Sequence, residues 1–238
     1  LDIFVSRGLG YVYKRQGDDS IFGGSGVDIL DGGDGTDTAN FGAAANIVDL
    51  RKAISQNTGE GNDTLISIEH VNARGGDDTV HGNSETNVLR GNEGADTLYG
   101  YEGNDVLDGG SGADTLYGGD GNDSLFGGSG DDILDGGDGN DRVDGGSGAD
   151  DLRGGDGNDR YIIDNINDTI TEGESKGTDT AYSLASTFTL SNYVENLKLA
   201  GSSDIDGVGN GLANTITGNS GANTCLLYTS DAADDQAS

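Results

Sequence analysis

The sequence has few basic residues and no long apolar run. Its 238 residues contain 12 lysines and arginines against 43 aspartates and glutamates, which gives a formal net charge of −31. A surface of this sign repels phosphate backbones and anionic headgroups, so we expect no nucleic-acid partner and no anionic membrane surface as partner. No apolar stretch has the length of a transmembrane helix, so we also expect no membrane span.

The residues that commonly carry catalysis are scarce as well. The only two histidines, His70 and His81, do not form a His-Glu-x-x-His zinc motif. Neither a Gly-x-Ser-x-Gly nucleophile elbow nor a Gly-Lys-(Ser/Thr) phosphate loop occurs. We therefore expect no catalytic residue in this chain and classify it as a non-enzyme.

Methionine is absent and there is one cysteine, Cys225. The lack of methionine indicates a fragment of a longer protein. The two ends also differ from the rest. Val12–Gln16 can be encoded by GTG TAT AAG AGA CAG, whose reverse complement contains codons for the Cys-Leu-Leu-Tyr found at 225–228, as in a sequencing-library adapter. We expect 1–16 and 225–238 to be non-native tails, which leaves the natural segment without disulfide or thiolate chemistry.

Glycine and aspartate are abundant, and they recur with a fixed period. From Gly82 to Ile162 the chain consists of nine consecutive nonapeptides of the form Gly-Gly-x-Gly-x-Asp-x-(Leu/Val)-x, numbered here as positions one to nine. The x-Leu-x triplet predicts a short strand with one inward side chain, and the glycine-rich hexad predicts a turn. Position three alternates between serine and aspartate from Ser111 onward, so the structural repeat is eighteen residues, with two strands in each coil. The pattern predicts stacked coils.

One buried leucine in nine residues does not offset the conformational entropy of ordering them, so the turns need a further source of stability. Stacking places the position-six aspartates in two rows, one along each edge of the coils. Ca²⁺ accepts six to eight oxygen ligands in a flexible geometry, whereas Mg²⁺ demands an octahedron. Residues 82–162 carry 19 acids and 4 bases, a net charge of −15 that about eight Ca²⁺ ions would offset. A disordered acidic tract, the alternative, would need no fixed period.

The predicted ligands are therefore side-chain carboxylates at position six and backbone carbonyls of the paired glycines. The carboxylates are those of Asp28, Asp37, Asp78, Asp96, Asp105, Asp114, Asp123, Asp132, Asp141, Asp150 and Asp159. The carbonyls are those of Gly110, Gly112, Gly119, Gly121, Gly128, Gly130, Gly137, Gly139, Gly146 and Gly148.

This nonapeptide resembles the signature of RTX (repeats-in-toxin) proteins, including haemolysin-type and serralysin-like C-terminal repeat regions of secreted Gram-negative bacterial proteins. The resemblance covers nearly everything between Gly17 and Thr224. It implies an all-β, right-handed parallel β-roll, calcium as the folding ligand, folding outside the cell or at its surface, and export through the type I secretion apparatus.

The period breaks twice, and the two breaks resemble each other. Gly61-Asn62-Asp63-Thr64 matches Gly177-Thr178-Asp179-Thr180, and Ile68–Val71 matches Val194–Leu197. We expect strands at 45–50 and 64–68 in the first break, and at 161–163, 168–171, 178–184, 188–190 and 194–199 around the second. The predicted organisation is short RTX repeats at 17–40, an interrupting β module at 41–72, the main β-roll at 73–162, a capping β module at 163–208, and degenerate terminal repeats at 209–224.

The leading hypothesis is a structural calcium-binding module of a larger secreted protein. Two alternatives stay open: the chain is the C-terminal part of an exoenzyme, a serralysin-like metalloprotease or a lipase, whose catalytic domain lies outside it, or it is a section of an adhesin.

Overall fold

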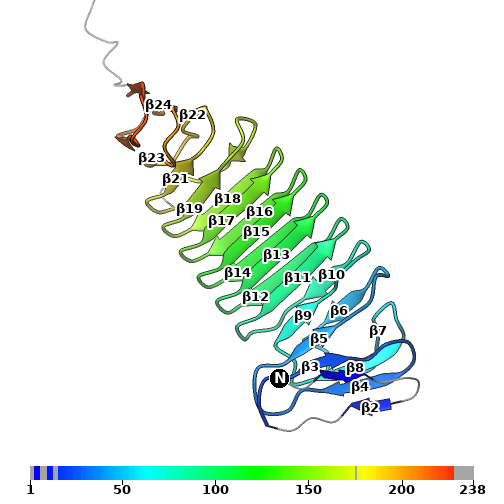
Figure 1. Cartoon of the computed structure of the whole chain (residues 1–238). Helices are drawn as coiled ribbons and strands as arrows, with labels where there is room; N and C mark the ends of the chain where they lie inside the picture. The colour runs from blue at the N-terminus through cyan, green and yellow to red at the C-terminus, as the bar shows by residue number, and fades with distance from the viewer. Residues whose placement is uncertain (1–2, 6–9, 13–15, 175, 228–238) are drawn as a thin grey trace, which may run out of the picture.

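The computed structural model describes residues 3–5, 10–12, 16–174 and 176–227, and every regular element in them is a β-strand. The described part contains no helix that is long and apolar enough to cross a membrane. The strands stack into one elongated solenoid, a parallel β-roll, with the N-terminal strands at one end and the C-terminal strands at the other (Figure 1). The predicted β-roll is confirmed.

One side of the roll is a continuous sheet of twelve strands. In spatial order these are β1 (Ile3–Val5), β3 (Ser20–Phe22), β5 (Thr38–Asn40), β9 (His70–Asn72), β11 (Val88–Glu93), β13 (Val106–Ser111), β15 (Ser124–Ser129), β17 (Arg142–Ser147), β19 (Arg160–Ile163), β21 (Thr180–Ser183), β23 (Asn196–Leu199) and β25 (Thr215–Thr217).

The opposite side is divided into three sheets. The first contains β2 (Gly10–Val12), β4 (Asp28–Asp31), β8 (Asn62–Ile66) and β7 (Gln56–Asn57). The second contains β20 (Thr169–Ile170), β18 (Asp151–Asp156), β16 (Ile133–Asp138), β14 (Thr115–Asp120), β12 (Thr97–Glu102), β10 (Thr79–His81) and β6 (Ile47–Asp49). The third contains β22 (Thr187–Thr189), β24 (Asp206–Val208) and β26 (Cys225–Leu226).

The eighteen-residue coil follows directly from the strand register. Leu98 of β12 pairs with Leu116 of β14, and Leu107 of β13 pairs with Leu125 of β15. These position-eight leucines are fully buried and form the core between the two sides. The regular strands are longer than the predicted triplet, because pairing continues through positions one to three of the following unit. Glu102, for example, pairs with Asp120.

The twelve-stranded sheet continues through both breaks in the period. Strand β9 pairs with β5 on one side and with β11 on the other. On the opposite side, β8 pairs with β4, whereas the earlier strand β6 pairs with β10. The chain therefore makes one step back along the roll between β6 and β8, and this step separates the first sheet of the opposite side from the second.

The strands expected around the breaks are present with small shifts of their bounds, as for β6, β8, β21 and β23. The predicted tails 1–16 and 225–238 lie partly outside the described residues, namely at 1–2, 6–9, 13–15 and 228–238. Within their described parts, β1, β2 and β26 pair in parallel with strands of the roll.

Glycine at position four is required by the stacking of the coils. Gly121 has a φ of 139°, a value that L side chains rarely adopt, and a Cβ built there meets the carbonyl oxygen of Gly103 in the preceding coil. The backbones of neighbouring coils therefore approach too closely for any side chain at this position.

We expect Gly121→Ala to lower the free energy of unfolding by about 1–3 kcal/mol from the strained φ alone, and further because the new Cβ must displace a backbone carbonyl. Gly211→Ala is the control, since no atom lies within 4 Å of a Cβ at that position. Urea unfolding followed by circular dichroism in saturating calcium measures both. Equal midpoints for the two variants would contradict the steric argument.

Candidate metal centre

The position-six aspartates form two hydrogen-bonded rows along the roll. The backbone N–H of Asp105 donates to Oδ1 of Asp123 at 2.7 Å, and the N–H of Asp123 donates to Oδ1 of Asp141 at 2.8 Å. The second row follows the same rule, with 2.7 Å from Asp96 to Asp114 and 2.8 Å from Asp114 to Asp132. Each carboxylate thus links its own turn to the turn eighteen residues earlier.

The other carboxylate oxygen of these residues has no hydrogen-bond partner, although it is buried. This holds for Oδ2 of nine predicted ligands, and their side chains are almost inaccessible, with Asp123 2 % exposed. The nine are Asp78, Asp96, Asp105, Asp114, Asp123, Asp132, Asp141, Asp150 and Asp159. An orphaned oxygen at this depth costs free energy unless a proton or a cation compensates it.

Burial also raises the pKa of these carboxyls, because a charged group loses hydration in the folded chain. The pKa rises from 3.8 to about 7 at Asp96 and Asp141, and to about 6 at Asp105 and Asp132. Neighbouring carboxylates of the same row add to the shift, as Asp123 does at Asp141, while the backbone N–H bonds oppose it. The rows therefore need neutralisation at neutral pH.

Five of the ten glycines predicted to donate carbonyls are at position two, near the ends of strands β13 to β17, and five are at position four, in the turns that follow. All ten have a positive φ. A Cβ at Gly128 or Gly130 would meet the carbonyl oxygen of Gly110 or Gly112, respectively, so these oxygens lie against the next coil. Position one differs, since a Cβ at Gly118 would meet Oδ2 of Asp123 in the same unit. The assignment of particular carbonyls as ligands stays a prediction.

The donor set fits a hard cation. Carboxylate oxygens without partners recur every nine residues beside backbone carbonyls, and oxygen donors are those that Ca²⁺ takes. The residues that would hold it are the position-six aspartates together with glycine carbonyls of the turns.

Both remaining predicted ligands, Asp28 and Asp37, are buried at the N-terminal end. The N–H of Asp28 donates to Oδ1 of Asp63 at 2.9 Å, and the N–H of Asp37 donates to Oε2 of Glu69 at 2.7 Å. The first of these bonds joins Asp28 to a repeat unit that was not among the predicted ones. Residues 58–66 read as a nonapeptide with Thr58 at position one and Asp63 at position six.

The structure adds other acids to the rows. Asp159 donates its N–H to Oδ1 of Asp179 at 2.8 Å, Asp150 donates to Oδ1 of Asp168 at 3.2 Å, and Asp179 donates to Oε2 of Glu195 at 2.8 Å. Glu195 and Glu69 thus take the place of a position-six aspartate. Two features of the sequence indicate these additional acids. The segments around Glu69 and Glu195 match each other, and Asp63 and Asp179 both lie in a Gly-x-Asp-Thr sequence that also occurs in the repeats.

Asparagine at position six behaves differently from aspartate. Oδ1 of Asn214 accepts the N–H of Asn210 within its own turn at 2.8 Å, and Asn223 does the same with Asn219 at 2.9 Å. Their Oδ1 atoms therefore close their own turns, and at Asn214 the link to the preceding coil is made by Nδ2, which donates to the carbonyl of Val194 at 3.1 Å. A neutral residue suits the C-terminal units, where weaker calcium binding is predicted.

A prediction for pH follows from the direction of the pKa shifts. These carboxyls hold protons more tightly in the folded chain than at the ordinary value of 3.8, so without divalent cations the fold is most stable at acidic pH. This contribution is lost as the pH rises through about 6 to 7. Far-UV circular dichroism in chelator should therefore show more β-structure at pH 5 than at pH 8, and Asp141→Asn should flatten the profile. More β-structure at pH 8 would contradict the assignment.

Comparison with known proteins agrees with this geometry. The model of the RTX calcium-binding nonapeptide repeat, which holds four copies, matches residues 15–48, 69–89, 81–116, 99–134, 108–143 and 126–161. These matches span 15–48 and 69–161, more than half of the chain. No curated protein matches it. The chain therefore belongs to the family of RTX calcium-binding nonapeptide repeats.

Proposed function

We propose that this chain is a calcium-driven folding module of a secreted bacterial protein, with no catalysis of its own. Calcium ions, on the order of eight, bind along the two rows through position-six carboxylates and glycine carbonyls. The observation that carries the proposal is the set of buried Oδ2 atoms without partners. In the absence of a cation these rows oppose folding, and in its presence they hold successive coils together.

The concentration of calcium then decides whether the module is folded. A ligand that binds only the folded chain stabilises it by mass action, and several sites act together. Calcium-binding modules outside cells typically have dissociation constants of about 10⁻⁴–10⁻³ M. With such affinities the chain stays unfolded where calcium is scarce, which suits export through a type I channel, and folds in the extracellular medium.

Calcium is favoured over magnesium by the way the ligands are supplied. The position-six side chains offer carboxylate oxygens, and the glycine turns offer carbonyls whose positions follow from the backbone. Such a set suits the six to eight ligands and flexible geometry of Ca²⁺. Mg²⁺ requires a near-ideal octahedron and gives up its water reluctantly, so we expect it to leave the chain unfolded.

The test is a calcium titration of the full chain from chelator, followed by far-UV circular dichroism, with magnesium as control. We expect a cooperative transition from coil to β-structure with calcium alone. In Asp123→Asn, which keeps the shape of the side chain but removes its charge, the midpoint should rise about tenfold, equivalent to about 1.4 kcal/mol.

The matched control is Asp108→Asn, which removes the same charge from position nine, where the side chain is about half exposed. Its midpoint should stay close to that of the original chain. β-structure that is complete in chelator and unaffected by calcium would overturn the proposal, and equal midpoints for the two variants would overturn the ligand assignment.

A further inference from the structure

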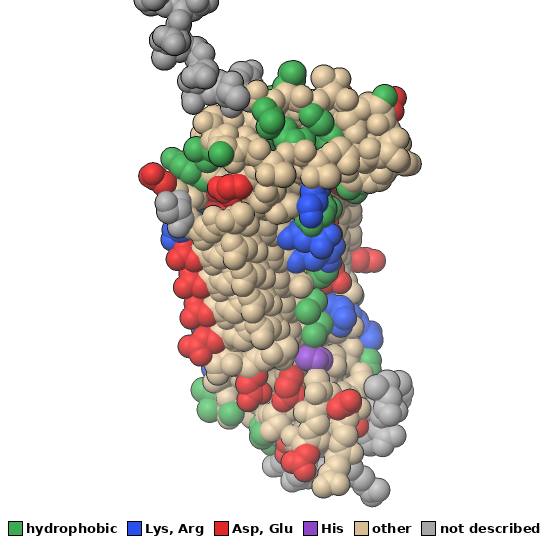
Figure 2. Space-filling model, turned by 90° about the vertical axis from the view of Figure 1, so that its left-hand side faces the viewer, with side chains coloured by type: hydrophobic (Ala, Val, Ile, Leu, Met, Phe, Trp, Pro, Cys, Tyr) green, Lys and Arg blue, Asp and Glu red, His purple; other side chains and the backbone are tan. Residues whose placement is uncertain are grey.

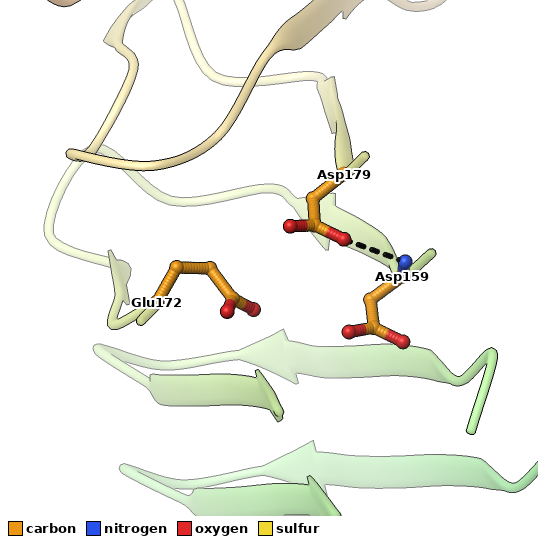
Figure 3. A group of neighbouring side chains, drawn as sticks. All are labelled: Asp159, Glu172 and Asp179. Carbon is orange, nitrogen blue, oxygen red and sulfur yellow. Dashed lines mark hydrogen bonds between the residues drawn. The ribbon is translucent and has the colours of Figure 1, made fainter. Parts of the chain in front are cut away.

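Three carboxylates meet at the C-terminal end of the regular roll. Asp159, Glu172 and Asp179 each place one carboxylate oxygen within 4.8 Å of the other two. Figure 3 shows the three side chains directed toward a common space, with Asp179 bonded to the backbone N–H of Asp159. Asp159 and Asp179 are buried and Glu172 is half-buried.

Glu172 occupies a place that glycine holds in the regular units. It lies eighteen residues after Gly154, whose N–H donates to its Oε1 at 3.2 Å, so Glu172 stands at position one of the next coil. In the regular units this glycine leaves its space to the position-six carboxylate, as Gly118 does for Asp123. The Glu172 side chain therefore lies where a regular unit has no position-one side chain, and it adds its carboxylate to those of Asp159 and Asp179.

The chain contains an internal comparison for this replacement. In the unit 58–66, position one is Thr58, and its hydroxyl donates to Oδ2 of Asp63. The hydroxyl supplies the proton that this carboxylate oxygen lacks in the regular units. An ionised glutamate at the same position has no proton to donate and adds a negative charge instead.

The three carboxylates form no ion pair within the described part of the chain. The nearby Lys176 pairs with Asp156 instead. Oδ2 of Asp159 is without a hydrogen-bond partner in a side chain that is 2 % exposed. This buried orphan oxygen is an observation independent of the clustering.

We propose that Asp159, Glu172 and Asp179 bind one Ca²⁺ ion at the C-terminal end of their row, in a site that differs from those of the repeats by a third carboxylate, supplied from position one. Oxygens on opposite sides of Ca²⁺ are about 4.6–5.2 Å apart, since each bond is about 2.3–2.6 Å long, and the three oxygens fall within this span. With three carboxylates, this site should bind calcium more tightly than the repeat sites, where position one is glycine and adds no carboxylate.

Tyr161 serves the site as a positioning residue. It replaces the core leucine at position eight, is fully buried, and donates its hydroxyl proton to Oε1 of Glu172. This bond holds the glutamate carboxylate inward, toward the two aspartates. The phenol also lies close enough to the three carboxylates to sensitise the luminescence of Tb³⁺, a common substitute for Ca²⁺.

The test counts calcium ions bound to the full chain at saturation by equilibrium dialysis, with folding checked by circular dichroism. Glu172→Gln should bind one ion fewer than the unchanged chain, while Glu174→Gln, an equal charge change on an exposed neighbour, should bind the full number. Tb³⁺ emission excited through tyrosine should fall in both Glu172→Gln and Tyr161→Phe, but Tyr161→Phe should keep the ion count. Glu172→Thr, which copies Thr58, should lose the ion and keep the fold, and it replaces Glu172→Gln if that variant does not fold.

An equal ion count for Glu172→Gln and Glu174→Gln would overturn the site. A Glu172→Gln chain that is more stable in chelator and loses no ion would also overturn it. That result would mean that the three carboxyls share a proton, and that the glutamine amide replaces the protonated carboxyl as hydrogen-bond donor. Both results leave the proposed function intact, provided that the repeats bind calcium. If the unchanged chain binds no calcium at all, the proposed function fails together with this site.

Discussion

The structure depends on the position-six carboxylate, of which only one oxygen has a hydrogen-bond partner in the regular units. At position six, Oδ1 accepts a backbone N–H from the preceding coil, and this bond sets the vertical alignment of the turns. The same alignment buries Oδ2 without a partner and raises the pKa of the group. In the regular units the interaction that defines the stacking therefore also creates the need for a cation.

The glycines follow from this constraint. Position one is glycine in the regular units because the carboxylate of its own unit occupies the space of a side chain. Position two from Gly110 onward and position four from Gly94 onward are glycine because carbonyls of the preceding coil occupy that space. The exposed acids at position three are a separate feature. Glu102, Asp120, Asp138 and Asp156 stack in register, and Figure 2 shows acidic side chains aligned along one edge of the roll.

Much of this architecture can be predicted from the period alone, because stacking in register by eighteen residues fixes which side chains are buried. The core leucines and the alignment of the position-six aspartates follow from it. The units around Asp63 and Asp179 were missed because position one is Thr58 or Glu172 instead of glycine, and the second unit has two additional residues before Gly177. The pairing of β8 with β4 and of β6 with β10 could not be predicted from the sequence for another reason. Both strands are short and each buries one central hydrophobic side chain, Val48 or Leu65, so this pattern does not indicate which coil each strand joins.

The exceptions at position one show how the chain can tune its dependence on cations. Thr58 supplies a proton donor to Asp63, which removes the need for a cation at that turn. Glu172 does the opposite beside Asp159 and Asp179, because it adds a further carboxylate to two that are already buried. A residue other than glycine at position one thus makes one turn less dependent on cations, at Thr58, and another turn more dependent, at Glu172. Since both turns keep the hydrogen bond to the preceding coil, the roll continues through each of them, and only the energetics of folding differ.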